Sequence, residues 1–405
     1  MTVSPRSYWP LVPSIFAQAM VVTTVGFLAP LLLAMAGDLD VSPAKIGQLV
    51  VVTSVPWAVG APFWGLLSDR LGRRPVIVAA LLGVAACTIA GAFATEFWML
   101  AGLRLLTGCF GSGGPPTILA GLVDHYPASQ RGRVIGWTTT SFSFAALLGV
   151  PSLGAVGGAW GWRTAFVVAG LGLATAAAFV WLAYPRTAPK HSAGDTAWQA
   201  YRHLLTRPHL ATLLLSNLCE RATFMVVTLY LASFLIQRYA LDPVTVAPAL
   251  FLIAVGALTG AIGGGFVTDR FDRVRLASVT LAVSGVCGLA AFVWPLHVVF
   301  SVAAGFGFGL ANAASRVPFM AIVLGLSERN RGALNGLIAM SHQVGWALGA
   351  GLGGWILAVA GYRGLGQLTL VAALASAALV IVARSATRVP AIGSAAPEAA
   401  PSASP

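Results

Sequence analysis

Long apolar stretches, separated by short polar breaks, run along nearly the whole chain. A helix needs about 20 apolar residues to cross a bilayer core of about 30 Å. Twelve stretches of about that length can be counted. We therefore predict an all-α polytopic membrane protein with twelve transmembrane helices. The predicted spans are 11–35, 46–67, 76–94, 98–123, 134–157, 164–184, 209–236, 246–267, 276–294, 298–324, 334–359 and 365–383.

The composition supports this prediction, because 58% of the 405 residues are apolar and 9% are charged, against about 25% in a soluble domain. The net charge of +12 follows the predicted topology. With the N-terminus in the cytoplasm, seventeen of the 24 lysine and arginine residues fall in cytoplasmic segments, four fall outside and three lie within spans. This asymmetry is typical of the positive-inside rule. We therefore expect both termini in the cytoplasm and no nucleic-acid partner.

The chain contains an internal repeat with a constant offset of 200 residues. The stretch GLLSDRLGRR at 65–74 aligns with GFVTDRFDRV at 265–274, and GWR at 161–163 aligns with GYR at 361–363. Six spans is an even number, so both copies enter the membrane from the same side, as parallel repeats with pseudo-twofold symmetry do. We predict an N-terminal six-helix bundle at 1–184, a cytoplasmic linker at 185–208, a C-terminal six-helix bundle at 209–384 and a disordered cytoplasmic tail at 385–405.

Twelve spans as six plus six, with GxLxDRxGRR between the second and third, resemble the major facilitator superfamily from about residue 8 to residue 384. The second copy departs from the motif at Asp272, where the first has Gly72. Arg104 followed by Gly108 is similar to the RxxxG element of proton-coupled members. GVPSLG at 149–154 is similar to the GPxxG signature of antiporters, with one extra residue before the proline. The resemblance implies the major facilitator fold, alternating access and a bacterial inner-membrane location, and favours an efflux member.

The repeated loop concentrates charge at the inner ends of two helices. An aspartate there can accept hydrogen bonds from helix-end N–H groups or from an arginine, and a glycine permits a tight turn. We predict that this gating cluster latches helix ends in one conformation and releases them in another. The alternative is that its arginines only set topology. The predicted cluster contains Gly65, Asp69, Arg70, Gly72, Arg73, Arg74, Asp269, Arg270 and Arg273.

Charges inside the spans are the sharper clue, because each costs at least about 2.5–3.5 kcal/mol at mid-membrane unless it faces a cavity or a partner. Asn217, Glu220 and Arg221 share one helical face, and Asn312 and Arg316 repeat the i, i+4 spacing. The resemblance implies that spans 1, 4, 7 and 10 line the cavity. The predicted substrate and proton cavity is lined by Gln18, Arg104, Asn217, Glu220, Arg221, Asn312, Arg316, His342 and Gln343.

Four of these residues also have a purely structural interpretation. Arg104 can pair within its own half of the protein, or helix-terminal carbonyls can hold it. Glu220 can be a static partner for Arg316. Gln18 can make a single interhelical hydrogen bond, and His342 can be a packing residue. Three in-span arginines against one glutamate nevertheless leave a positive surplus, which predicts a neutral or anionic substrate.

Enzyme chemistry has no motif in this chain: there is no nucleophile elbow, no phosphate-binding loop and no clustered metal ligands. We expect no enzyme activity, no cofactor and no metal, so energy has to come from an ion gradient, with Glu220 as the first candidate proton carrier. The sequence predicts a secondary active transporter, a monomer in the bilayer, that couples protons to export of a small organic solute. The alternatives are uptake of a small organic anion and, more remotely, a non-transporting receptor or a membrane enzyme.

Overall fold

A computed structural model describes residues 8–127, 130, 134, 137, 138, 140–142, 144–186, 202, 204, 206, 207, 209–268, 270–293, 297–326 and 331–383. These residues form helices and no strands, so the all-α prediction is confirmed. The elements are α1 Leu11–Gly26, α2 Leu28–Asp38, α3 Pro43–Leu71, α4 Arg73–Gly91, α5 Phe97–Gly111, α6 Pro115–His125, η1 Ala145–Gly149, α8 Val150–Trp160, α9 Trp162–Ala183, α11 Leu210–Tyr239, α12 Pro243–Thr268, α13 Arg273–Val293, α14 Val298–Leu324 and α15 Arg331–Val382.

Nine helices in the described part of the chain are long and apolar enough to cross a membrane, or ten if a bent pair counts as one span. That pair is α1 and α2, which bend by 42° around Phe27. The predicted fourth span is divided between α5 and α6. The predicted eleventh and twelfth spans both lie in α15, on either side of Gly361. Breaks within the predicted spans therefore shift the helix boundaries in the described part of the chain.

Glycines make the sharp turns that the repeat predicts. Gly161, before α9, has φ of 87°, and its counterpart Gly361, within α15, has φ of 63°. Gly72, between α3 and α4, has φ of 91°. Residues with a Cβ rarely adopt such angles. The repeated glycines at 161 and 361 thus share a backbone requirement.

The departure of the second copy from the loop motif has a local physical reason. Asp272 stands where the first copy has Gly72, and its Oδ1 accepts a hydrogen bond of 2.8 Å from the backbone N–H of Arg275. A carboxylate before the first turn satisfies an unpaired helix N–H and complements the helix dipole. The second copy therefore begins α13 with a side-chain cap, whereas the first begins α4 after a glycine turn.

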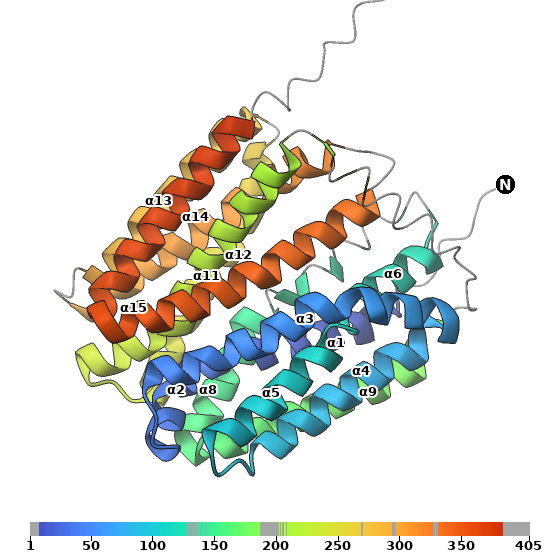
Figure 1. Ribbon diagram of the computed structural model, residues 1–405, viewed down its shortest axis with the longest axis horizontal. Helices are drawn as coiled ribbons and strands as arrows, with labels where there is room; N and C mark the ends of the chain where they lie inside the picture. Colours follow the sequence, from blue (N-terminus) through green and yellow to red (C-terminus); the bar gives the residue numbers. More distant parts are fainter. Residues whose placement is uncertain are drawn as a thin grey trace, which may run out of the picture.

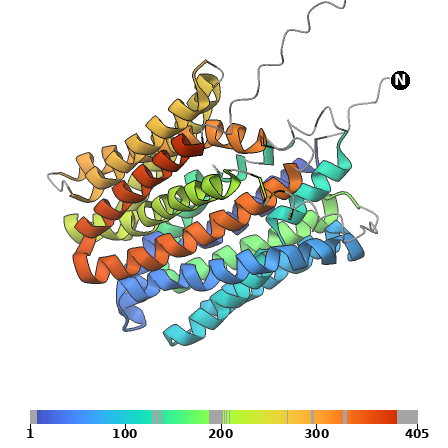
Figure 2. The same cartoon turned by 45° about the horizontal axis from the view of Figure 1, so that its top comes forward.

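The helices form two groups, α1 to α9 and α11 to α15, and Figures 1 and 2 show α3 and α15 side by side between them. One end of the molecule, where α3 begins and α15 turns at Gly361, is named here the Gly361 end; the opposite end is the Asp69 end. Near the Gly361 end, the amide Nε2 of Gln48 donates to the Gly351 carbonyl at 3.3 Å. A Cβ at Gly47 would collide with the Tyr230 hydroxyl. Small residues thus let helices from the two groups approach closely.

The predicted boundaries of the two bundles stay a prediction. Most of the predicted linker at 185–208 and all of the predicted tail at 385–405 lie outside the described residues.

The two repeated glycine turns yield a stability prediction. Nothing lies within 4 Å of a Cβ added at Gly161 or Gly361, so alanine there meets backbone strain and no clash. We expect each of Gly161→Ala and Gly361→Ala to lower the free energy of unfolding by about 1–2 kcal/mol. The measurement is thermal unfolding in detergent. The matched control is Gly102→Ala, a site of equal space inside α5, where alanine raises helix propensity; equal melting temperatures for all variants would contradict the prediction.

Candidate functional site

A charged cluster on α11 and α14 forms the centre of the candidate site. The guanidinium of Arg221 donates from both Nε and Nη2 to the carboxylate of Glu220. From α14, Arg316 Nη1 approaches the same carboxylate at 3.3 Å. One negative charge is therefore held between two positive charges. The cluster carries a net charge of +1.

Two asparagines complete the cluster and connect it to α15. The side-chain oxygen of Asn217 accepts a hydrogen bond of 2.7 Å from Arg316, and its amide nitrogen donates to Ser341 Oγ at 2.6 Å. The oxygen of Asn312 accepts from Arg221 at 3.4 Å. The cluster thus links α11 and α14 through charge-assisted hydrogen bonds, which are stronger than neutral ones, and reaches α15 through a neutral hydrogen bond.

Arg316 is the member of the cluster that a solute can reach most easily. Its side chain is 25% exposed, compared with 5% for Glu220 and 8% for Arg221. The cavity beside these residues has a volume of about 10 Å³, which is roughly the space for one water molecule and far less than an organic solute requires. A solute can therefore enter the cluster only if helices or side chains move.

Arg104 occupies a second buried position, in the other group of helices. Its side chain is on α5, is 1% exposed, and donates from Nη2 to the carbonyl of Thr24 at 3.0 Å. Thr24 lies in the last turn of α1, where carbonyls lose their helical partners. Nε and Nη1 of Arg104 have no hydrogen-bond partner among the described residues. The guanidinium thus stabilises the break between α1 and α2 and keeps two unused donors.

The remaining predicted cavity residues lie on α1 and α15. Gln18 is buried on α1, and its Oε1 has no partner in the described part of the protein. Gln343 is buried on α15, and its Oε1 likewise has no hydrogen-bond partner among the described residues. His342 stands edge-on to Trp346, with 4.6 Å between the ring centroids. The structure therefore brings five of the predicted residues into direct contact and places Gln18 and Arg104 on other helices.

The predicted gating cluster is built around Arg73, the first residue of α4. Its guanidinium lies 2.7 Å from the Asp69 carboxylate and 3.5 Å from that of Asp124 on α6, and it donates to Ser68 Oγ. Arg74 lies over the ring of Trp181 on α9, 4.8 Å from the centroid. Four helices thus meet at one cation-rich corner of the Asp69 end. Gly65 lies in α3 with no atom within 4 Å of an added Cβ.

The second copy of the gating cluster is described only in part. Asp269 lies outside the described residues. Arg270 and Arg273 are exposed, and so is Arg70 in the first copy. In this conformation the described contacts of the gating cluster lie within the first group of helices.

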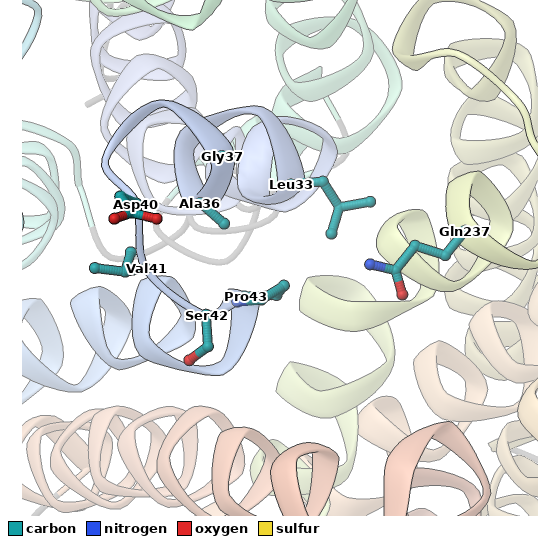
Figure 3. A pocket seen from close by; sticks show the side chains of 8 residues that line it. All are labelled: Leu33, Ala36, Gly37, Asp40, Val41, Ser42, Pro43 and Gln237. Carbon is teal, nitrogen blue, oxygen red and sulfur yellow. The ribbon is translucent and has the colours of Figure 1, made fainter.

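A second cavity lies at the Gly361 end, apart from the charged cluster. Figure 3 shows Gln237 of α11 facing the end of α2 and the segment before α3. The volume of this cavity is about 520 Å³. Gln237 lies 16 residues beyond Arg221 on α11, hence about 24 Å along the axis. The cavity is lined by Leu33, Ala36, Gly37, Asp40, Val41, Ser42, Pro43 and Gln237.

Sequence reasoning did not single out several residues that contact the candidate site. Ser341 and Trp346 lie in a span with no charge, where serine and tryptophan are ordinary. Asp124 falls just beyond the predicted fourth span, and an acidic residue followed by His125 at a span end was the available signal. Thr24 contributes through its backbone, which leaves no trace in the sequence.

Comparison with known proteins identifies the family. The family model described as Major Facilitator Superfamily matches residues 14–315 and 249–404. The gallate transporter of Pseudomonas putida is 27% identical, over 72% of this chain and 73% of its own length. A chloramphenicol resistance protein of Streptomyces lividans is 29% identical, over 65% of this chain and 66% of its own.

A solved structure has the same fold. The inward-facing, unoccupied structure of a bacterial homologue of the human lysosomal transporter Spinster aligns with a TM-score of 0.74 and 18% identity, covering 94% of this chain and 97% of that one. This likeness, the apolar helices and the family match over nearly the full length agree with each other. The chain therefore belongs to the Major Facilitator Superfamily and is a multi-pass membrane transporter with that fold.

Proposed function

We propose that this transporter carries a small organic acid together with a proton. The observation that supports the proposal is the cluster of Glu220 between Arg221 and Arg316, with one carboxylate shared by two guanidinium groups. The net positive charge of the cluster attracts a second carboxylate, brought by the solute. A guanidinium binds a carboxylate through two parallel hydrogen bonds, which gives the solute a defined orientation.

The same cluster supplies a route for proton coupling. Arg316 holds Glu220 and is the most exposed member of the cluster, so the carboxylate of the solute competes with Glu220 for this guanidinium. An ionised carboxylate that loses a partner within a membrane is costly. Glu220 therefore takes up a proton when the acid binds, and both cross together. The solute and the proton thus bind cooperatively, although they occupy different groups.

Export of a neutral compound through proton antiport is the second candidate. The specific observation in its favour is the similarity to a chloramphenicol resistance protein, because chloramphenicol carries no ionised group. The similarity to a gallate transporter favours the first candidate, because gallate is a carboxylate. The two candidates differ in whether solute binding takes up or releases a proton.

The topology of the proposal follows the distribution of positive charge. The Asp69 end carries the arginine-rich loop, so we place it and both termini in the cytoplasm of a bacterial cell, with the Gly361 end outside. The proton gradient is the energy source. A monomer is sufficient, because both groups of helices and the charged cluster belong to one chain.

The coupling role of Glu220 is tested in proteoliposomes with labelled gallate. Wild-type protein is expected to accumulate gallate in response to an imposed proton gradient. Glu220→Gln keeps the shape of the side chain but cannot exchange a proton. It is expected to lose accumulation by about tenfold or more and to retain gallate exchange in counterflow.

The control for this test is Glu96→Gln, an exposed acid before α5, which should behave as wild type. Gradient-driven accumulation by Glu220→Gln at the wild-type level would contradict the proposed coupling.

The gating cluster makes a separate prediction. Asp69→Asn removes the charge that holds Arg73, and we expect the transport rate to fall to about a tenth or less while the protein stays folded and inserted. The measurement is initial uptake rate per inserted molecule. Asp272→Asn is the matched control in the second copy, because asparagine also caps a helix. Wild-type rates for Asp69→Asn would mean that the loop charges only set topology.

A further inference from the structure

Two side chains on α15 bury polar atoms that have no hydrogen-bond partner within the described part of the chain. The indole Nε1 of Trp346 can only donate, and the amide oxygen Oε1 of Gln343 can only accept. Trp346 is 8% exposed and Gln343 is 9% exposed. Nearly all buried polar groups in proteins have partners. Two such unpaired atoms within one helical turn therefore require an explanation.

The two atoms are complementary in type, and their residues are three apart on one helix. Residues three apart on a helix point to the same side, with Cβ atoms about 5–6 Å apart. Trp346 and Gln343 nevertheless do not bond to each other. A hydroxyl group accepts one hydrogen bond and donates another. A single hydroxyl can therefore satisfy both side chains at once.

The helix that carries this pair packs against the charged cluster. Gly345 lies between the two residues in sequence, and a Cβ there would collide with the Arg221 side chain and the Leu218 carbonyl. One turn earlier, Ser341 accepts the hydrogen bond from Asn217. The segment of α15 from Ser341 to Trp346 is therefore packed directly along the face of α11 that carries Glu220 and Arg221.

We infer that Trp346 and Gln343 recognise a hydroxyl group on the transported acid, whose carboxylate is bound by Arg316. The substrate class is thus a small hydroxylated carboxylic acid, and the inference rests on the proposed function. The indole N–H donates to the hydroxyl oxygen, and the hydroxyl proton is donated to the amide oxygen of Gln343. Specificity arises because an acid without the hydroxyl leaves both buried groups unpaired.

The test compares matched pairs of acids in proteoliposomes: 4-hydroxybenzoate with benzoate, and lactate with propionate. Each acid competes for counterflow of its labelled partner. Two additional hydrogen bonds should give the wild-type protein a preference of about tenfold for the hydroxylated member of at least one pair. Trp346→Phe keeps an aromatic ring and removes the N–H, and Gln343→Leu removes the acceptor. Each should reduce the preference to about threefold or less, with the affinity for the plain acid unchanged.

Trp355→Phe is the control, because Trp355 is on the same helix and 64% exposed. The inference is overturned if Trp346→Phe keeps the full preference, or if it weakens both members of a pair equally, as a packing role would. Equal affinities within both pairs in the wild-type protein would also overturn it, while leaving proton-coupled acid transport intact. Exchange of neutral solutes with no exchange of any acid would instead contradict the proposed function itself.

Discussion

The cost of burying charge in an apolar medium constrains the centre of this transporter. Arg221 and Arg316 stabilise the negative charge of Glu220. In turn, the two arginines have Glu220, Asn217 and Asn312 as their hydrogen-bond partners. Removing Glu220 would leave two unpaired positive charges, whose cost exceeds the net value of the pairs they belonged to. A cluster of this kind tolerates a change of partners far better than a loss of partners. A solute can therefore bind by placing its own carboxylate on Arg316 in place of that of Glu220.

The surrounding fold is arranged so that helices can approach closely around the cluster and turn sharply at their ends. Glycines at 345 and 349 place α15 against the backbone and side chains of α11, and Gly108 on α5 admits the backbone of α3. Arg104 supplies a donor where the break after α1 leaves a carbonyl without its helical partner. Within a membrane the hydrophobic effect does not drive helices together, because lipid tails are as apolar as the side chains. Close packing by small residues and hydrogen bonds to broken helix ends stabilise the bundle instead.

The sequence predicts the fold well because apolar length is a physical requirement of a membrane-spanning helix and the repeat adds a second, independent signal. Apolar length marks the spans, and the 200-residue offset marks the repeat, including the glycine turns at 161 and 361. The breaks within spans were not predicted: hydropathy does not distinguish one long helix from α5 and α6, or a regular helix from the π-helical turn at η1. The last two predicted spans, 334–359 and 365–383, correspond to the two parts of α15, because the chain turns between them at Gly361.

For the candidate site, helical spacing brought Asn217, Glu220 and Arg221 to one face of α11 and aligned Asn312 with Arg316. It could not show that Arg221 reaches back to its own neighbour while Arg316 crosses from α14, because that depends on how the helices pack. Trp346 could not be found at all. A tryptophan in an apolar span is unremarkable until its N–H is seen to lack a partner. Whether a buried polar group has a hydrogen-bond partner can be seen only in the structure.

The central claim is that the carboxylate of the solute and a proton bind together, because the solute displaces Glu220 from Arg316. The most direct measurement is the number of protons exchanged when purified protein in detergent binds 4-hydroxybenzoate, obtained from titration calorimetry in buffers of different ionisation enthalpy. Above the pKa of the acid, the account predicts uptake of about one proton for each molecule bound. Binding with no proton exchanged, or with a proton released, would contradict it.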